Sequence, residues 1–95
     1  MPITVELRTE FANHEPEERL VGIGLPGQLF GDLRFELLKW IDPWGDTVFN
    51  RGQCQALVAE ITQAESIFRC DLTALRRLAE RAALEPHAYL VFIGD

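Results

Sequence analysis

The sequence is poor in cysteine and in positive charge, and each shortage excludes a class of protein. Its two cysteines, Cys54 and Cys70, lie outside any Cys-x-x-Cys spacing. We therefore expect two reduced, partly buried thiols rather than a disulfide. Lys and Arg total 9 against 15 Asp and Glu, so the formal net charge is −6. Because nucleic-acid binders normally carry a basic surface, we expect no nucleic-acid partner.

Long apolar runs and targeting signals are lacking as well. The longest uncharged apolar run, Ala88 to Ile93, is far shorter than the roughly 20 residues that a membrane-spanning helix needs. Residues 1–6 show neither the basic region nor the apolar core of a signal peptide. We therefore expect a cytoplasmic protein with no membrane partner.

What is present is the composition of one globular domain. The length of 95 residues fits a single domain, and no segment repeats or is low in complexity. Hydrophobic residues make up 47% of the chain and charged residues 25%, which is ordinary for a folded protein. We predict a single domain over residues 1–95.

The first part of the chain predicts three strands. Apolar residues alternate with polar ones at the start, and one parity holds Ile3, Val5, Leu7 and Phe11. Such a period of two is typical of a strand with one buried face. A short second strand is predicted around residues 20–23, and a third over residues 33–41. Asp42-Pro43-Trp44-Gly45 then has the residue types of a β-turn.

The second part predicts two helices and a final strand. Asn50 is a possible N-cap, and Gln53 completes a capping-box pattern before an apolar stripe of Cys54, Leu57, Val58, Ile61 and Ala64. A second helix starts near Asp71, which can cap it, and ends before Pro86. Residues 88–93 are apolar on both parities, which is typical of a central strand covered on both faces.

These elements run in the order β-β-β-α-α-β and predict an α+β fold. We expect a mostly antiparallel sheet of about four strands with two helices packed on one face. The second face would be apolar, with side chains from the third and last strands: Leu38, Trp40, Tyr89 and Val91. Exposed apolar patches commonly mark interaction surfaces, so we expect a homodimer formed through a sheet face or edge. The alternative is that the loop at residues 24–32 folds over this face.

The densest polar group surrounds the predicted turn and is the candidate partner-binding or ligand-binding site. It consists of Trp40, Asp42, Trp44, Asp46, Thr47 and Asn50. The carboxylates of Asp42 and Asp46 could bind a cation or act as acid and base. They could equally bond the backbone amides of the turn and of the following helix, which is the interpretation we favour. Trp44 would be an interface anchor if exposed, and would lock the turn to the core if buried.

Three other patterns carry weaker signals. Gly22-Ile23-Gly24-Leu25-Pro26-Gly27 fits G-x-G-x-x-G, but a strand is predicted where a dinucleotide site needs a helix. His14 and His87 lack a metal-ligand spacing, so we predict no metal site and no cofactor. Cys54 falls on the apolar stripe and Cys70 has no assignable base, so we predict no catalytic residue.

Charge is unevenly distributed along the chain. Residues 1–50 hold nine acids and four bases, whereas residues 51–95 hold six acids and five bases. This asymmetry predicts an acidic side that suits a protein partner with a basic surface.

The stretch Trp40-Ile41-Asp42-Pro43-Trp44-Gly45-Asp46-Thr47-Val48-Phe49-Asn50 resembles one found in a group of small uncharacterised bacterial proteins. These proteins carry a similar Asp-Pro-aromatic-Gly-Asp-Thr stretch before a helix, and they end in a strand like residues 89–95. They resemble products of the mobile gene pool, including integron gene cassettes and immunity-type genes. The resemblance implies no catalytic residue.

Together these features predict a non-catalytic acidic interaction module. We expect it to self-associate and to bind or neutralise a protein partner, as an immunity protein does. The alternative is a small-ligand-binding protein or small enzyme with a pocket between helices and sheet, near Trp40, Trp44 and Asp46. A deep pocket with convergent polar groups would favour that alternative, because fold alone does not decide function.

Overall fold

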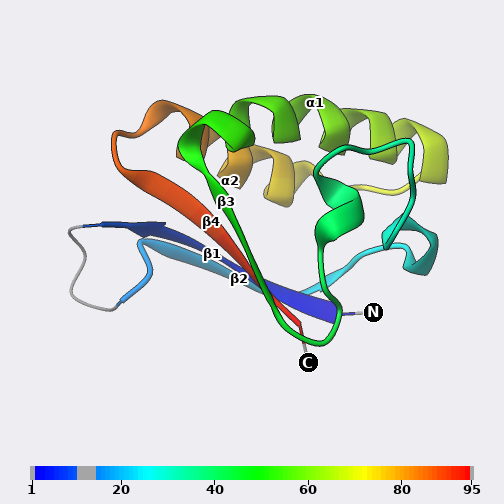
Figure 1. Cartoon of the computed structure of the whole chain (residues 1–95), viewed down its shortest axis with the longest axis horizontal. Coiled ribbons are helices and arrows are strands. Elements are labelled where there is room, and N and C mark those ends of the chain that lie inside the picture. Colours follow the sequence, from blue (N-terminus) through cyan, green and yellow to red (C-terminus); the bar gives the residue numbers. More distant parts are fainter. Residues whose placement is uncertain (1, 11–14, 95) are drawn as a thin grey trace.

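Helices and sheet form two layers in this computed structural model, which describes residues 2–10 and 15–94 (Figure 1). The strands are β1 (Pro2–Thr9), β2 (Glu18–Gly24), β3 (Asp46–Asn50) and β4 (Ala88–Ile93), and the helices are α1 (Arg51–Phe68) and α2 (Thr73–Leu84). Two short 3₁₀ helices, η1 (Gly27–Leu29) and η2 (Leu38–Trp40), lie between β2 and β3. The predicted order β-β-β-α-α-β is confirmed.

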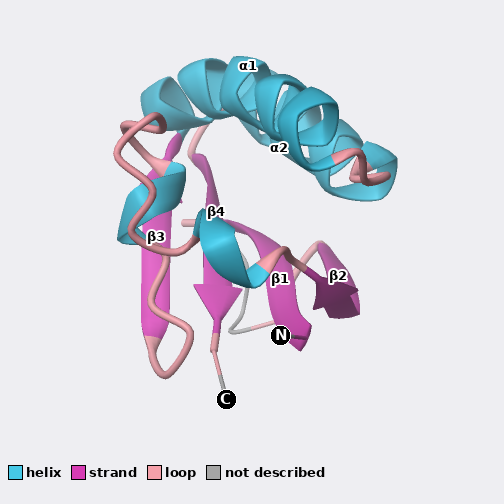
Figure 2. Ribbon diagram, turned by 90° about the vertical axis from the view of Figure 1, so that its right-hand side faces the viewer, coloured by secondary structure: helices cyan, strands magenta, loops and turns pink. Residues whose placement is uncertain are grey.

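The sheet is antiparallel throughout, and its strands lie in the order β2-β1-β4-β3. β4 is therefore a central strand, as its apolar residues on both parities predicted, while β2 and β3 form the two edges. Both helices cover the same face of the sheet (Figure 2). In the part of the chain that the structure describes, no helix covers the opposite face, which we call the open face.

The core fills the layer between the helices and the sheet. Val5 and Leu7 of β1 and Leu90 and Phe92 of β4 point into it and are completely buried. The predicted apolar stripes of the two helices pack against these strand residues. The buried stripe residues are Cys54, Leu57, Ile61 and Ala64 of α1, and Leu75, Leu78, Ala79, Ala82 and Ala83 of α2.

The helix ends follow the sequence closely. The Asn50 side chain accepts a hydrogen bond from the Gln53 N–H at 2.8 Å, and the Gln53 side chain accepts one from the Asn50 N–H at 2.9 Å. The predicted capping box is therefore confirmed. α2 begins at Thr73, slightly later than predicted, and its N-cap is Leu72 rather than Asp71. Asp71 lies just before the cap and accepts a hydrogen bond from the N–H of Thr73 at 2.9 Å.

The predicted third strand over residues 33–41 is wrong. The buried residues of this segment are Phe35, Leu38 and Ile41, which recur at every third position rather than every second. Leu33, expected on the buried parity of a strand, is exposed instead. The segment therefore follows the core as a succession of turns, and the third strand of the sheet is β3.

Hydrogen bonds explain why this segment is not a strand. The N–H groups of Leu37 and Leu38 donate to the Glu60 carboxylate of α1, at 3.0 Å and 3.1 Å to Oε1. The N–H groups of Trp40 and Ile41 donate to carbonyls within η2, at 3.0 Å and 3.2 Å. Because a backbone donor serves one main partner, these residues have no N–H groups left for a sheet ladder.

The loop at residues 24–32 does not shield the open face. Leu25 and Leu29 are buried in the core cluster, and Phe30 packs against that cluster. The loop therefore closes the layer between helices and sheet, and the alternative prediction that it folds over the second sheet face is wrong.

Two expectations about the environment of the chain can be compared with the structure. Within the described residues, no helix combines the length and the apolar character needed to cross a membrane. Cys54 and Cys70 are both free thiols, as predicted.

Candidate functional site

The open face has a charged half on β1 and β2. There the carboxylate of Glu6 accepts hydrogen bonds from Arg8 Nε at 2.8 Å and from Arg19 Nε at 2.7 Å. Glu6 is only 2% exposed. Burial alone would raise the pKa of Glu6, but the hydrogen bonds and charges of the two arginines outweigh it and hold that pKa below its ordinary value. The charged groups of this half therefore pair with one another.

The other half of the open face is apolar and is formed by β3 and β4. We define this apolar half by Val48, Tyr89, Val91 and Ile93. The strand pairing sets Val48 opposite Val91, and the alternation along β4 puts Tyr89 and Ile93 on the same face. Val48 is 56% exposed, Tyr89 and Ile93 are half-buried, and Val91 is nearly covered by its neighbours.

The residues predicted for self-association are divided by the structure. Tyr89 and Val91 lie in the apolar half of the open face. Leu38 and Trp40 do not, because they belong to η2 and not to a strand. Leu38 is buried in the core, so its predicted place on a sheet surface is wrong.

Two exposed tryptophans lie beside the β3 edge of the sheet. Trp44, in the turn before β3, is 73% exposed and so is free to act as a surface anchor. Trp40 is 67% exposed, and its carbonyl accepts a hydrogen bond from Thr47 Oγ1 at 3.4 Å, which places its backbone next to β3. Large aromatic side chains in such positions are enriched among the residues that dominate binding energy.

The polar residues around the turn mainly build the turn itself. Asp42 Oδ1 accepts a hydrogen bond from the N–H of Trp44 at 2.8 Å, and Thr47 Oγ1 accepts one from the N–H of Asp42 at 3.0 Å. Asn50 caps α1. The bond of Asp42 agrees with the favoured interpretation that the two carboxylates of the turn serve the backbone. Asp46 does not fit it, because its side chain makes no hydrogen bond among the described residues. Among the described residues no ion pair includes Asp46, and no His, Cys, Asp and Glu group could hold a metal ion.

Gly94 locks this turn to the end of β4. Its N–H donates to the carbonyl of Gly45 at 2.9 Å. A Cβ atom at Gly94 would lie 2.4 Å from the carbonyl carbon of Pro43, so only glycine fits there without moving the backbone. The contact fixes the position of the turn, and with it Trp44, relative to the sheet.

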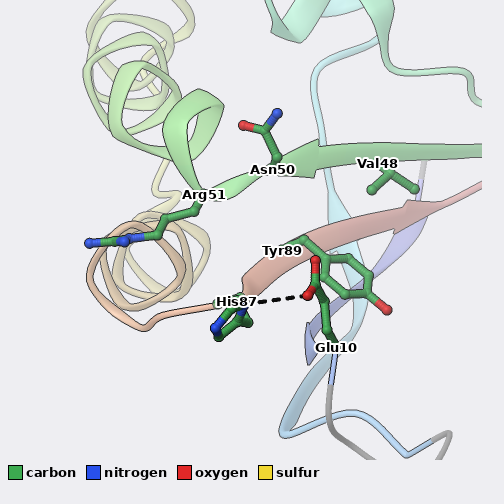
Figure 3. Close-up of a pocket in the computed structure, with 7 residues that line it drawn as sticks. Glu10, Val48, Asn50, Arg51, His87 and Tyr89 are labelled. Carbon is green, nitrogen blue, oxygen red and sulfur yellow. Dashed lines mark ion pairs between the residues drawn. The ribbon is translucent and has the colours of Figure 1, made fainter.

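A hollow of about 400 Å³ lies where β3 meets α1 (Figure 3). Its lining residues are Glu10, Val48, Asn50, Arg51, His87, Ala88 and Tyr89. His87 Nδ1 lies 3.3 Å from Glu10 Oε2, and both side chains are more than half exposed. This pair therefore lacks the dry surroundings in which catalytic groups are usually tuned. The hollow is on the open side of the sheet, away from the predicted pocket position between helices and sheet.

The remaining candidates from the sequence do not form sites. Burial raises the pKa of the Cys54 thiol to about 11, so Cys54 behaves as a buried apolar residue. Burial and the nearby charges of Glu65 and Asp71 raise the pKa of Cys70. The glycine pattern at residues 22–27 spans β2 and η1, without the long helix that a dinucleotide site needs. Phe11 and His14 lie outside the described residues.

Many acidic side chains pair within the chain. Arg81 alone contacts Glu17, Glu18 and Glu85, at 3.8 Å, 3.1 Å and 2.6 Å. The others in ion pairs are Glu6, Glu10, Asp32, Glu65 and Glu80. Many of the acidic side chains are therefore paired with arginines or, for Glu10, with His87, while the formal net charge of the chain stays at −6.

Neither the strand β3 nor the exposed position of Val48 was predicted from the sequence. The signal was present, since Thr47-Val48-Phe49 is a short run of β-prone residues directly before the N-cap Asn50. No sequence pattern of this kind indicates the residues that line the hollow. Glu10 and His87 meet only because β1 pairs with β4, and no local pattern reveals that pairing.

No family model, curated protein or solved structure matches the chain. The resemblance through residues 40–50 therefore stays a prediction, and the function has to be argued from the surface of the molecule.

Proposed function

We propose that the protein is a non-catalytic interaction module of the cytoplasm that self-associates through the apolar half of the open face. One observation carries this proposal: both helices cover one face of the sheet, while Val48, Tyr89 and Ile93 remain partly exposed on the other. Burial of apolar surface contributes about 25 cal/mol per Å², so burying exposed side chains of this half against another protein surface stabilises a complex.

A different protein with a basic rim is the second occupant that this surface suits. Asp46 lies at one end of β3 beside the apolar half, and the chain carries a net charge of −6. Such charge speeds association with a basic partner more than it adds to final affinity. Neutralising that partner, as immunity-type proteins do, is the biological form that this binding takes in our proposal.

The test compares the same substitution on the two edges of the sheet. Val48 and Val21 are both exposed valines, at 56% and 75%, and lie on β3 and β2. We expect the wild-type chain to sediment as a dimer at high micromolar concentration. Val48→Lys should raise the dimer Kd by at least about tenfold, because it puts a charge at the centre of the contact.

Val21→Lys is the matched control and should leave the dimer Kd unchanged. Equal thermal unfolding midpoints of the two variants would show that both keep the fold. A wild-type chain that remains monomeric at high micromolar concentration would contradict the proposed self-association.

A further inference from the structure

We infer that two copies of the chain pair antiparallel along β3, the outer edge of the apolar half, so that two sheets become one and the two apolar halves form one continuous face. This inference rests on the proposed self-association and adds its geometry. Three observations carry it: the regular course of β3, the outward direction of its backbone groups, and the order of side chains along it.

Among the residues that the structure describes, β3 is a regular outer strand that pairs with β4 alone. It pairs with β4 over Asp46–Asn50 without any shift of register. The carbonyl of Gly45 accepts a hydrogen bond from the N–H of Gly94, so the backbone groups of Gly45 face β4. Because antiparallel strands alternate, the N–H and C=O of Asp46 and Val48 face away from the sheet. They are available to another strand.

The side chains of β3 are complementary to a second copy of themselves. With Val48 opposite Val48, antiparallel pairing sets Asp46 of each copy opposite Asn50 of the other. The Asn50 amide points away from β4, beyond the sheet edge (Figure 3). Its oxygen already accepts the N–H of Gln53, which leaves its NH₂ group to donate to the facing carboxylate.

The same side chains disfavour the neighbouring register. Centring the pair on Asp46 would set two carboxylates directly opposite each other, which is destabilising. Centring it on Val48 avoids that repulsion and brings the two exposed valines together.

The test uses the Asp46–Asn50 pairing in the whole 95-residue chain. Asp is as good an N-cap as Asn, so Asn50→Asp keeps α1 capped while setting two carboxylates opposite each other in each half of the dimer. We expect Asn50→Asp to raise the dimer Kd roughly tenfold. Adding Asp46→Asn exchanges the two side chains and should restore the Kd to within about threefold of the wild-type value.

Net charge is controlled with Gln55→Glu, which adds the same charge on an exposed position of α1 and should leave the Kd unchanged. Sedimentation equilibrium measures all four proteins. A dimer that is insensitive to Asn50→Asp, or that is not restored by the double substitution, would overturn the β3 pairing while leaving self-association intact. A monomeric wild-type chain would overturn both.

Discussion

β2 and β3 are both outer strands of one sheet, yet they present very different edges. β2 is bulged, because Val21 and Gly22 together lie opposite a single residue of β1, and Gly22 has a φ of +70°. Its side chains are tied down as well, with Arg19 bound to Glu6 and Glu18 bound to Arg81. β3 is regular, and the exposed side chain at its centre is a valine.

This difference shows which edge is protected against pairing. Bulges and charged side chains are the usual means by which proteins prevent edge strands from binding other strands. β2 has both, whereas on β3 only Asp46 is charged. The β3 side is therefore the edge that our proposal assigns to binding, while the ion pairs of the β2 side contribute to stability.

The largest effect on stability is expected from replacing Glu6, whose carboxylate holds Arg8 and Arg19 on the β2 side of the sheet. Glu6→Ala leaves Arg8 and Arg19 without their shared acceptor and should lower the free energy of unfolding by about 2 kcal/mol. Denaturant titration measures this loss. Glu36→Ala, at an exposed position outside the sheet, is the control and should change stability by less than about 0.5 kcal/mol.

The dimer Kd of Glu6→Ala should stay at the wild-type value, since Glu6 lies on the charged half. A large change in that Kd would show that binding is not confined to the β3 side.

A smaller effect is expected from the glycine in the β2 bulge. Gly22→Ala forces a side chain into the left-handed region and should cost about 1 kcal/mol of unfolding free energy. Gly24→Ala is the matched control, because Gly24 lies on the same strand without a positive φ and with open space around it. Thermal unfolding should show a lower midpoint for the first variant only. Equal midpoints would mean that the bulge carries no strain.

The smallest expected effect is a change in the stability contributed by Glu6 when the pH is lowered. The pKa of Glu6 is lower in the folded chain than its ordinary value of 4.5, so ionised Glu6 stabilises the fold above that ordinary value. This contribution is lost as the pH falls through the folded pKa. The stability difference between the wild type and Glu6→Gln should therefore shrink between neutral pH and about pH 3. A difference that stays constant over this range would contradict the role assigned to the ion pairs.

Local patterns predicted much of this fold and less of its surface. The capping box at Asn50 and Gln53 and the apolar residues of β4 follow from neighbouring residues alone. Residues 33–41 were misassigned because their apolar positions fit a period of two as well as a period of three. The period of three is adopted because Glu60, far along the chain, binds the N–H groups of Leu37 and Leu38 and so prevents them from joining a sheet.

Residues of the apolar half could be predicted from the sequence only on β4, the one of its two strands that was predicted. Tyr89 and Val91 were named because β4 was recognised from its composition. Val48 was missed because the turn was assumed to lead directly into a helix, without a strand between them. The hollow beside Glu10 and His87 depends on pairing between distant segments, which a single sequence does not display.

The central place of β4 has a consequence for how the protein is made. β4 follows every other element described above, yet it separates β1 from β3 and pairs with both. Its contact between Thr4 and Ile93 closes a loop of almost the whole chain, which is slow to form. Until β4 has joined the sheet, neither the apolar half nor a supported β3 edge exists. In the proposed dimer, two copies therefore pair along β3 only after β4 has joined the sheet.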